Sequence, residues 1–497
     1  MNEFEAFERL KARLGPLWAE IFPRDDAPYT CVVVPSVSIE PVELERHGEA
    51  QFYEETLLFF LIRLRNPRAR VVYVTSEPIP APILDYYFHF LTGIPASHAR
   101  ARLTTVAAYD RSARPLAEKI LERPRLIQKI RAAIPDPARA YLTVFRSTPL
   151  ERRLAVALDI PLNAADPGMD DISTKSNSRR VFREAGIALP AGAEDLRTQD
   201  DLIEGLRALR ERNPGLRRAV LKLNRSYWDE GHAIYEFPEH RSKAAVREAL
   251  RRLQLSTPLG TPEGFLERYA RLGGVVEELQ TPECSTASAQ VRISPVGELS
   301  LTSTHDEIRA GETRMATAGC RFPAAEAYRQ AIQEAGLRVG RVLAARGLVS
   351  RASIEFLVVR EGPADPPRLL GSELNLGVGG STHPLLAVRF LSGGRFDPTS
   401  GLFHSPSGRP KYYRATDALA ATEYRRLSPE DLIEILTMHE LNYSPRSEAG
   451  ALFYMLGAIS ELGRVGMVAI GNSRDEAEAV YHHVIDVLAS ESRRPER

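Results

Sequence analysis

The sequence predicts an α/β protein of several domains, and three observations lead to this expectation. The chain has 497 residues, too many for one hydrophobic core, and at roughly 150 residues per domain it should form about three domains. In the first third, apolar runs such as YTCVVVPSVS alternate with helical segments such as QFYEETLLFFLIRL. Further along, paired strands joined by short polar turns alternate with long helices. Strands and helices in alternation indicate sheets covered by helices.

The region 1–148 is expected to form a mostly parallel sheet with helices on both faces. ARVVYVTSEPI indicates a second buried strand, and APILDYYFHFL indicates the helix after it. The helix PLAEKILERPRLIQKIRAAI and the strand AYLTVFRS follow. This alternation ends near residues 146–151, which places the first domain boundary there.

The region 149–395 is expected to form a second α/β domain with antiparallel strand pairs. The pair RAVLKLN and HAIYEF comes first, and the hairpin AQVRISPVGELSLTSTHD turns at residues 295–297. The helix AAEAYRQAIQEAGLRVGRVLAARG leads to a last hairpin, made of ASIEFLVVR and LLGSELNLG. Residues 396–497 then form a third, small α/β domain. It is expected to open with a polar loop, FDPTSGLFHSPSGRPKYYRATD, and to contain the apolar segment GALFYMLGAISELGRVGMVAIG.

Composition favours small molecules or peptides as partners. The 65 Lys and Arg residues balance the 65 Asp and Glu residues, so nothing in the net charge favours nucleic acid or an anionic membrane. The three cysteines lack C-x-x-C spacing, which indicates neither a zinc site nor a disulfide framework. No apolar run approaches the roughly 18 residues that span a bilayer, and the N-terminus lacks a signal-peptide pattern. We therefore expect a cytoplasmic protein without a membrane partner, and leave open whether it forms a homo-oligomer.

Two lysines are candidate ligands for a nucleotide phosphate. Lys175 lies in the polar segment ISTKSNSRR, and Lys222 interrupts the apolar strand AVLKLN. A lysine inside an apolar strand is costly unless its charge finds a partner, although it could also extend to the surface. The turn after Lys222, which contains Gly231, could fold over phosphates with its backbone N–H groups. No P-loop or Rossmann glycine motif is present.

Carboxylates on neighbouring strands predict a site for a divalent cation. Glu373 and Asn375 are two residues apart, so in a strand they project from the same face. Glu355 interrupts the preceding apolar strand in the same way, and oxygen ligands of this kind suit Mg²⁺ bridging the phosphates of ATP. Glu277 and Glu278 end another strand, where they could hold adenine and ribose. The alternative for the E-x-N pair is an exposed edge strand with two solvated polar groups.

This order of lysine, lysine, loop, acidic pair and E-x-N resembles the ATP-grasp ligases. More specifically, VVYVTSEPIPAPILDYYFHFLTGIPASHARARL is similar to the pre-ATP-grasp domain of the pheganomycin-type peptide ligases. SELNLGVGGSTHP is similar to their E-x-N segment, and YYRATDAL with GALFYMLGAISELGRVGMVAIG to their C-terminal domain. The resemblance covers nearly the whole chain and implies three domains: pre-ATP-grasp (1–148), ATP-grasp (149–395) and C-terminal (396–497).

The resemblance also implies a reaction and a set of residues. A carboxylate would attack the γ-phosphate of ATP, and an amine would displace phosphate from the acyl phosphate to form an amide. Lys175 and Lys222 match the lysines that contact phosphates. Glu277, Glu278 and Leu279 match the hinge that holds the adenosine. Glu355, Glu373 and Asn375 match the ligands of Mg²⁺, for which Mn²⁺ could substitute. Ser381, Thr382 and His383 would line the acyl-phosphate pocket.

Two positions depart from the pattern of this family. Related E-x-N motifs often continue to an arginine where this chain has Gly377, and the phosphate loop reads SYWDEGH instead of a short glycine-rich sequence. Arg292 is the candidate replacement for the missing cation, followed by Arg389 and Arg309. His305 and Asp306 are candidates for orienting the substrate.

The function implied is ATP-dependent ligation of an amino acid, or a similar carboxylate, to an amine or a peptide N-terminus. Two alternatives remain: an ATP-binding regulatory protein without catalysis, and a carboxylate kinase that releases its acyl phosphate.

Overall fold

The first region is built around a parallel sheet of four strands in the order β3-β2-β1-β4. The strands are β1 (Tyr29–Val34), β2 (Ala69–Thr75), β3 (Leu103–Ala107) and β4 (Ala140–Val144). Alternate side chains of β1 enter two different cores: Cys31 and Val33 pack into one, and Val32 and Val34 into the other. The apolar run is therefore buried on both faces, as predicted for a parallel sheet.

Helices cover both faces of this sheet. They are α1 (Glu3–Ile21), α2 (Pro41–His47), α3 (Ala50–Tyr53), the 3₁₀ helix η1 (Glu54–Arg65), α4 (Ala81–His89), α5 (Ala96–Arg100), α6 (Leu116–Leu121), α7 (Pro124–Ala132) and α8 (Pro149–Leu158). The single helix expected over residues 115–134 is instead α6 and α7. Pro124 starts the second of them, because proline suits the first turn of a helix and disfavours its interior.

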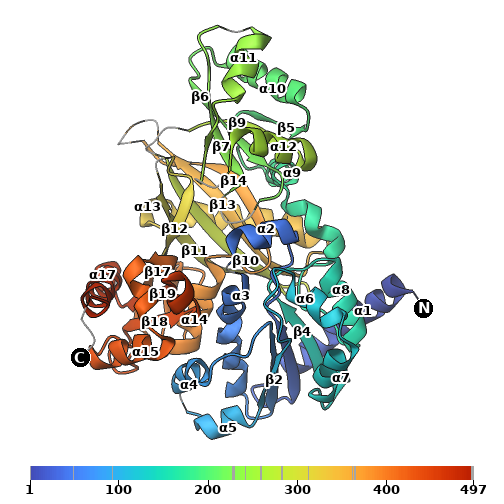
Figure 1. Ribbon diagram of the computed structural model, residues 1–497, viewed down its shortest axis with the longest axis vertical. Helices are drawn as coiled ribbons and strands as arrows, with labels where there is room; N and C mark the ends of the chain where they lie inside the picture. The colour runs from blue at the N-terminus through green and yellow to red at the C-terminus, as the bar shows by residue number, and fades with distance from the viewer. Residues whose placement is uncertain are drawn as a thin grey trace.

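The central region contains a five-stranded sheet in the order β5-β9-β6-β7-β8. Its strands are β5 (Gly192–Leu196), β6 (Arg218–Leu223), β7 (His232–Glu236), β8 (Gln254–Leu255) and β9 (Gly274–Glu278). The helices α10 (Gln199–Arg212), α11 (Lys243–Leu250) and α12 (Pro262–Leu272) pack with it. In Figure 1 this unit forms the top of the molecule.

A larger sheet joins the central and C-terminal regions. Its order is β14-β13-β10-β11-β12-β17-β16-β15, with α13 (Glu326–Ala345) packed on β10 and β11. The central strands are β10 (Ser285–Ile293), β11 (Leu299–Ala310), β12 (Ala316–Phe322), β13 (Ser350–Val359) and β14 (Arg368–Leu376). The two predicted hairpins, β10–β11 and β13–β14, are confirmed as antiparallel pairs. The short helix α9 (Lys175–Glu184) contacts β14.

The C-terminal region differs from the sequence expectation in one respect. The polar loop expected over residues 396–417 is wrong: the segment forms β15 (Arg395–Asp397), β16 (Leu402–His404) and most of β17 (Pro410–Ala420). β12 pairs with β17, so the sheet continues across the boundary expected near residue 396. β18 (Gly450–Tyr454) and β19 (Arg464–Gly471) extend it, and α14 (Thr382–Ser392), α15 (Pro429–Met438), α16 (Ala458–Leu462) and α17 (Arg474–Glu491) complete this region.

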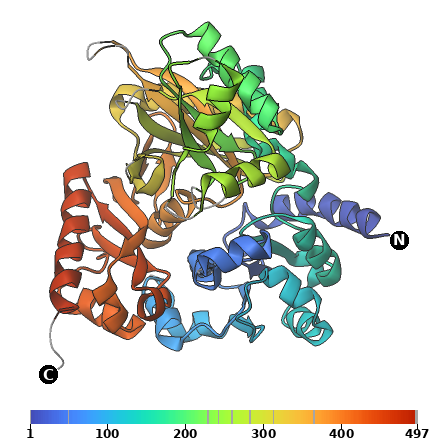
Figure 2. The same ribbon diagram turned by 45° about the horizontal axis from the view of Figure 1, so that its top comes forward.

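This computed structural model describes residues 2–48, 50–91, 93–226, 230–240, 242–257, 260–280, 284–311, 313–360, 362 and 365–493. Within these ranges, no helix combines the length and the apolar character needed to cross a bilayer. Figure 2 shows the central region at the top, the C-terminal region at the lower left and the N-terminal domain at the lower right. The N-terminal domain contacts the C-terminal region through η1 with α14 and α4 with α15.

Candidate active site

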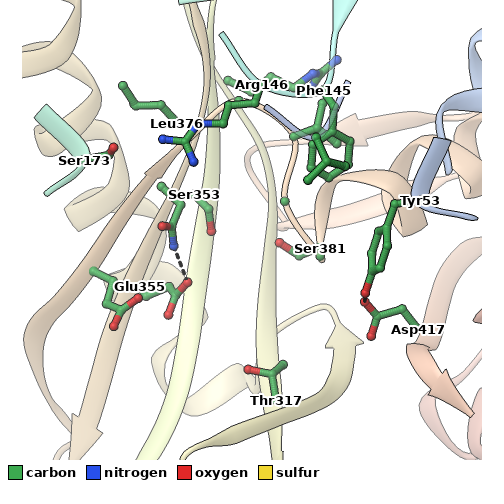
Figure 3. Close-up of a pocket in the computed structure, with 18 of the residues that line it drawn as sticks. Tyr53, Phe145, Arg146, Ser173, Thr317, Ser353, Glu355, Leu376, Ser381 and Asp417 are labelled. Carbon is green, nitrogen blue, oxygen red and sulfur yellow. Dashed lines mark hydrogen bonds between the residues drawn. The ribbon is translucent and has the colours of Figure 1, made fainter. Parts of the chain in front are cut away.

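A cavity of about 740 Å³ lies where the three regions meet. Its lining includes Arg63 from the N-terminal domain, Lys175 and Glu373 from the central region, and Asp417 and Tyr454 from the C-terminal region. Figure 3 shows Glu355 and Ser353 on one side of this space and Tyr53 and Asp417 on the other. The cavity therefore exists only because all three regions contribute to it.

The β13–β14 hairpin brings the predicted metal ligands together. In its register Glu355 lies opposite Glu373, and Ser353 lies opposite Asn375. Asn375 Nδ2 donates a hydrogen bond to Glu355 Oε1 at 2.9 Å. The two-residue spacing of the E-x-N motif places both of its side chains in the cavity wall. β14 is an edge strand, as that alternative expected, but both side chains are engaged by other groups of the site and are not simply solvated.

Glu373 is held between two basic groups. Lys175 Nζ lies 2.7 Å from Glu373 Oε2, and His232 Nε2 lies 2.8 Å from Glu373 Oε1. Burial alone would raise the pKa of Glu373, but Lys175 and His232 outweigh it and hold the pKa well below its usual range. Thr174 caps the helix that starts at Lys175 by accepting a hydrogen bond from Asn177 N, which fixes the base of this lysine.

Lys222 is buried and paired, so a lysine that extends to the surface is excluded. Its Nζ lies 3.1 Å from Glu277 Oε2 and 3.3 Å from Ser372 Oγ. Burial would lower the pKa of Lys222, but Glu277 and Glu373 outweigh this effect and raise it. Arg179 also forms an ion pair with Glu277. Both oxygens of this buried carboxylate therefore face cations already within the chain.

The rest of the predicted hinge continues from β9 toward the larger sheet. Glu278 N donates to Ala191 O at 2.9 Å, and Leu279 N donates to Arg218 O at 3.3 Å. Gly231 lies in the tight turn before β7, where an added Cβ would come within 2.1 Å of Ser226 Cβ. The expected phosphate loop around Tyr227 and Trp228 falls at residues 227–229, outside the described residues.

The environment of Glu355 suits a divalent cation. Its pKa is raised because it is buried and because the carboxylates of Glu307 and Glu373 are close. Arg309 Nη2 lies 3.0 Å from Glu307 Oε2 and 3.7 Å from Glu355 Oε2, which relieves only part of this repulsion. The described residues contain no group of three or more His, Cys, Asp or Glu side chains arranged to hold a metal. Two carboxylates and one amide therefore fit Mg²⁺ only when substrate oxygens supply the other ligands.

The candidate catalytic arginines differ in position. Arg292, on β10, lines the cavity and lies opposite Arg351 of β13. Arg389, on α14, is exposed and is not among the residues that line the cavity. Burial, with the nearby Arg63 and Arg389, lowers the pKa of Arg292 to about 10.

The start of α14 forms part of the cavity wall. Ser381 lines the cavity, and its Oγ accepts a hydrogen bond from Gln290 Nε2 at 2.7 Å. Thr382 and His383 are buried behind it and do not reach the lining. The His383 ring packs against Tyr454 with centroids 4.2 Å apart, and burial lowers its pKa to about 4.

His305 and Asp306 are not brought to the cavity. The structure gives them packing contacts instead. His305 Nε2 lies 2.5 Å from the Tyr413 hydroxyl of β17, and burial lowers the pKa of His305 to about 3. Asp306 accepts hydrogen bonds from the Tyr328 hydroxyl at 2.7 Å and from Ala325 N at 3.1 Å. β12 pairs with both β11 and β17, so Tyr413 reaches His305 across β12 within one sheet.

The sequence reasoning did not find His232, Glu307, Arg63 or Arg351. His232 directly follows the predicted turn glycine, and Glu307 keeps the two-residue alternation of β11 with Arg309. The alternation of side chains along a strand would have predicted that Glu307 and Arg309 lie on the same face. Arg63 lies in a helical segment whose neighbour in space is set by tertiary packing, which no local pattern reveals.

In sequence and in fold, the chain is similar to ATP-grasp enzymes, including a carboxylate–amine ligase. The IQCH-like ATP-grasp family matches residues 169–259 and 256–398, and the PGM1 C-terminal domain family matches residues 431–484. The chain is 27% identical over 467 residues to L-propargylglycine–L-glutamate ligase of Streptantibioticus cattleyicolor, covering 93% of this chain and 94% of that protein. The resemblance to ATP-grasp ligases drawn from the sequence is thereby confirmed.

Two further proteins are similar to this chain at lower identity. The chain is 23% identical over 427 residues to IQ motif-containing protein H of Danio rerio, and this match covers 76% of the chain and 40% of that protein. Biotin carboxylase of Campylobacter jejuni, solved in complex with an ATP analogue, has a TM-score of 0.56 at 12% identity. That match covers 94% of this chain and 96% of that one, and at this identity it supports the fold alone.

Proposed function

We propose that the protein joins the carboxylate of an amino acid, or a similar acid, to the amine of a second substrate in an ATP-dependent reaction. The observation that carries this proposal is the grouping of Lys175, Glu373, Glu355 and Asn375 at one end of a cavity large enough for further substrates. The L-propargylglycine–L-glutamate ligase of Streptantibioticus cattleyicolor, which is 27% identical along nearly its whole length, joins two amino acids.

The proposed reaction has two displacements. In the first, an oxygen of the acid attacks the γ-phosphorus of ATP, the bond to the β-phosphate oxygen breaks, and ADP leaves. In the second, the amine nitrogen attacks the acyl carbon and loses a proton, and the acyl–oxygen bond to phosphate breaks. The products are an amide, ADP and phosphate.

The chain's own residues stabilise charge and position groups in these steps. Lys175 and Lys222 are the proposed contacts for phosphate oxygens, and Arg292, which lines the cavity, is the proposed contact for the charge that develops on the transferred phosphoryl group. Glu355, Glu373 and Asn375 would hold Mg²⁺, which supplies charge neutralisation when bound. The hinge at Glu278 and Leu279 is the proposed contact for adenosine.

Hydroxylamine trapping tests the proposed intermediate. With Mg²⁺, ATP and pooled amino acids as acids, hydroxylamine should convert an acyl phosphate into a hydroxamate, and each hydroxamate should appear with one ADP. ADP formation without any hydroxamate would contradict the acyl-phosphate route. Hydroxamate formation with no amide from any amine would indicate a carboxylate kinase instead.

A second candidate is an ATP-binding protein without catalysis. It is favoured by Gly377, which takes the place of the arginine in related motifs and lies in the cavity wall with φ +95°. Such a protein would bind ATP and release no ADP with any acid and amine. Arg292 supplies a cation in the same wall, and for that reason we favour the ligase.

A further inference from the structure

Three arginines gather on one wall of the cavity. Arg292 and Arg351 are direct cross-strand partners on β10 and β13, and Arg63 comes from η1 of the N-terminal domain. All three line the cavity. Two of them contact aromatic rings at the end of α1: the Arg292 guanidinium lies 4.5 Å from the Trp18 ring centroid, and that of Arg63 lies 4.8 Å from the Phe22 centroid.

These arginines lack the carboxylate partners that the lysines of the site have. Among the described residues, no Asp or Glu pairs with Arg63, Arg292 or Arg351, and the groups that act on Arg63 are the phenols of Tyr29 and Tyr141 and the thiol of Cys31. Lys175 and Lys222, in contrast, pair with Glu373 and Glu277. Burial and mutual repulsion lower the pKa of Arg351 well below its usual range. An anion from outside the chain would offset the repulsion between these partly buried like charges.

Arg351 lies along β13 from the proposed phosphate end of the cavity, and Arg292 lies opposite it on β10. Arg351 lies four positions before Glu355 on β13, a distance of roughly 13 Å along an extended strand. A row made of Gln290, Ser353 and Asn375 lies between these two ends. Arg292 is proposed to meet the transferred phosphoryl group, which leaves the charges of Arg63 and Arg351 without a counterpart in the reaction.

We propose that Arg63 and Arg351, next to Arg292, form a subsite for a carboxylate that the reaction does not consume. This inference rests on the proposed function, because it assigns a part of each substrate. The retained carboxylate has two sources: a second carboxylate on the acid that is activated, or the free carboxylate of the amino acid or peptide that supplies the amine. A guanidinium offers paired N–H donors that match either one.

Equilibrium binding tests the subsite without any need for catalysis. The probes are glutarate, a simple dicarboxylate, and its monoamide, measured by calorimetry in the presence of ADP and Mg²⁺. The wild-type protein should bind glutarate at least ~10-fold more tightly than the monoamide, since one charge-assisted contact is lost. R351Q should remove this preference, R351K should restore part of it, and R368Q, which changes an exposed arginine at the far end of β14, should keep it.

Equal affinity of the wild-type protein for the two probes, or no binding of glutarate, would overturn the subsite even if the protein proves to be a ligase. Tighter binding of inorganic phosphate than of glutarate, lost in R351Q, would overturn the assignment to a carboxylate. A melting temperature of ligand-free R351Q below that of wild type, with the glutarate preference unchanged, would show a structural contact instead. We expect R351Q without ligand to melt at a higher temperature than the wild-type protein, because removing one of three like charges relieves repulsion. We also expect R351Q to lose the preference for glutarate.

Kinetics then identifies the source of the carboxylate. Each dicarboxylic acid is compared with the form in which its second carboxylate is amidated. Each amine substrate is compared with the form in which its terminal carboxylate is amidated. The rate of ADP release is measured for every substrate. Amidation of one substrate should raise its KM at least ~10-fold in the wild-type protein and R368Q and leave KM unchanged in R351Q. The substrate that responds carries the retained carboxylate. If amidation of neither substrate changes KM in an active enzyme, the proposal fails while the ligase function stands.

Discussion

At the scale of single residues, the buried lysines and the partly buried arginines in and near the cavity differ in how their charge is balanced. Lys175 and Lys222 each have a glutamate partner within the chain, so the ligand-free site is already ordered around them. Arg63 and Arg351 have none among the described residues. This difference in charge balance is the basis for the proposed phosphate end of the cavity and the proposed end for a substrate anion.

Replacing Lys222 by alanine should weaken ATP binding. A charge-assisted hydrogen bond contributes about 1.5–3 kcal/mol, so a loss of ~10- to 100-fold in affinity is expected. Calorimetric titration with ATP measures it, with K243A as the control, because Lys243 is an exposed lysine on α11. Unchanged affinity in K222A would show that this lysine only balances Glu277.

The positions of individual side chains could be predicted from the sequence where the alternation along a strand sets their direction. The E-x-N spacing placed Glu373 and Asn375 in the same wall, because strand side chains alternate. It could not find Arg351, whose importance depends on a partner strand nearly 60 positions away in sequence, at Arg292. It also could not show that the Tyr413 hydroxyl contacts His305, since this contact arises from the pairing of β12 with β17.

At the scale of elements, the packing of α9 on β14 sets the distance between Lys175 and Glu373. Gly371 of β14 passes directly over the buried ring of Phe182 on α9, and an added Cβ would lie 2.6 Å from the ring. Gly371 N also donates to Ala188 O at 2.8 Å, which fixes the strand to the segment after the helix. The close approach requires glycine at this position.

Replacing Gly371 by alanine should push α9 away from β14. Overpacking of this kind costs about 1–3 kcal/mol, and the free energy of unfolding in urea should fall by that amount. Activity should fall as well, because Lys175 moves relative to Glu373. G264A is the control: its Cβ would meet only Thr261 Oγ1 at 3.5 Å, an ordinary contact inside helix α12. A G371A variant as stable as the wild-type protein would contradict this packing argument.

Elements were predictable where turns and periodicity are strong, as in β10–β11 with its Pro-Val-Gly turn. The segment 396–417 was wrongly expected to be a loop because its strands are short and its composition polar. β17 alternates buried and partly exposed residues from Lys411 to Ala415, and its partners lie far away in sequence on β12 and β19. Such strands form through pairing that local composition does not reveal.

At the scale of the whole molecule, the N-terminal and C-terminal regions meet through a buried carboxyl group. Glu55 of η1 accepts a hydrogen bond from Gly457 N, at the start of α16, at 3.2 Å. Burial raises its pKa from 4.5 to about 7, although the backbone N–H groups of Gly457 and Leu456 act in the opposite direction. The folded protein therefore binds a proton here more tightly than the unfolded chain does.

Stability should consequently depend on pH through Glu55. Because its folded pKa lies above its unfolded value, its contribution is fully present below about pH 4.5 and is lost as pH rises through about 7. The loss is about 3 kcal/mol, from the size of the shift. E55Q cannot titrate at this position, so it does not lose this contribution. The difference between the free energies of unfolding of E55Q and the wild-type protein should therefore shift in favour of E55Q by about that amount between pH 5 and pH 8. A difference that does not change with pH would contradict the buried, raised state of Glu55.

The measurement that tests the proposed ligase most directly is product analysis with Mg²⁺, ATP and pooled amino acids and short peptides. We expect that ADP and a new amide mass appear together, and that E373Q, which disturbs the contacts of Lys175 and His232 and removes a proposed metal ligand, forms neither. An E373Q protein with full activity would contradict the site. ATP binding by the wild-type protein without ADP or amide from any pool would contradict the ligase itself.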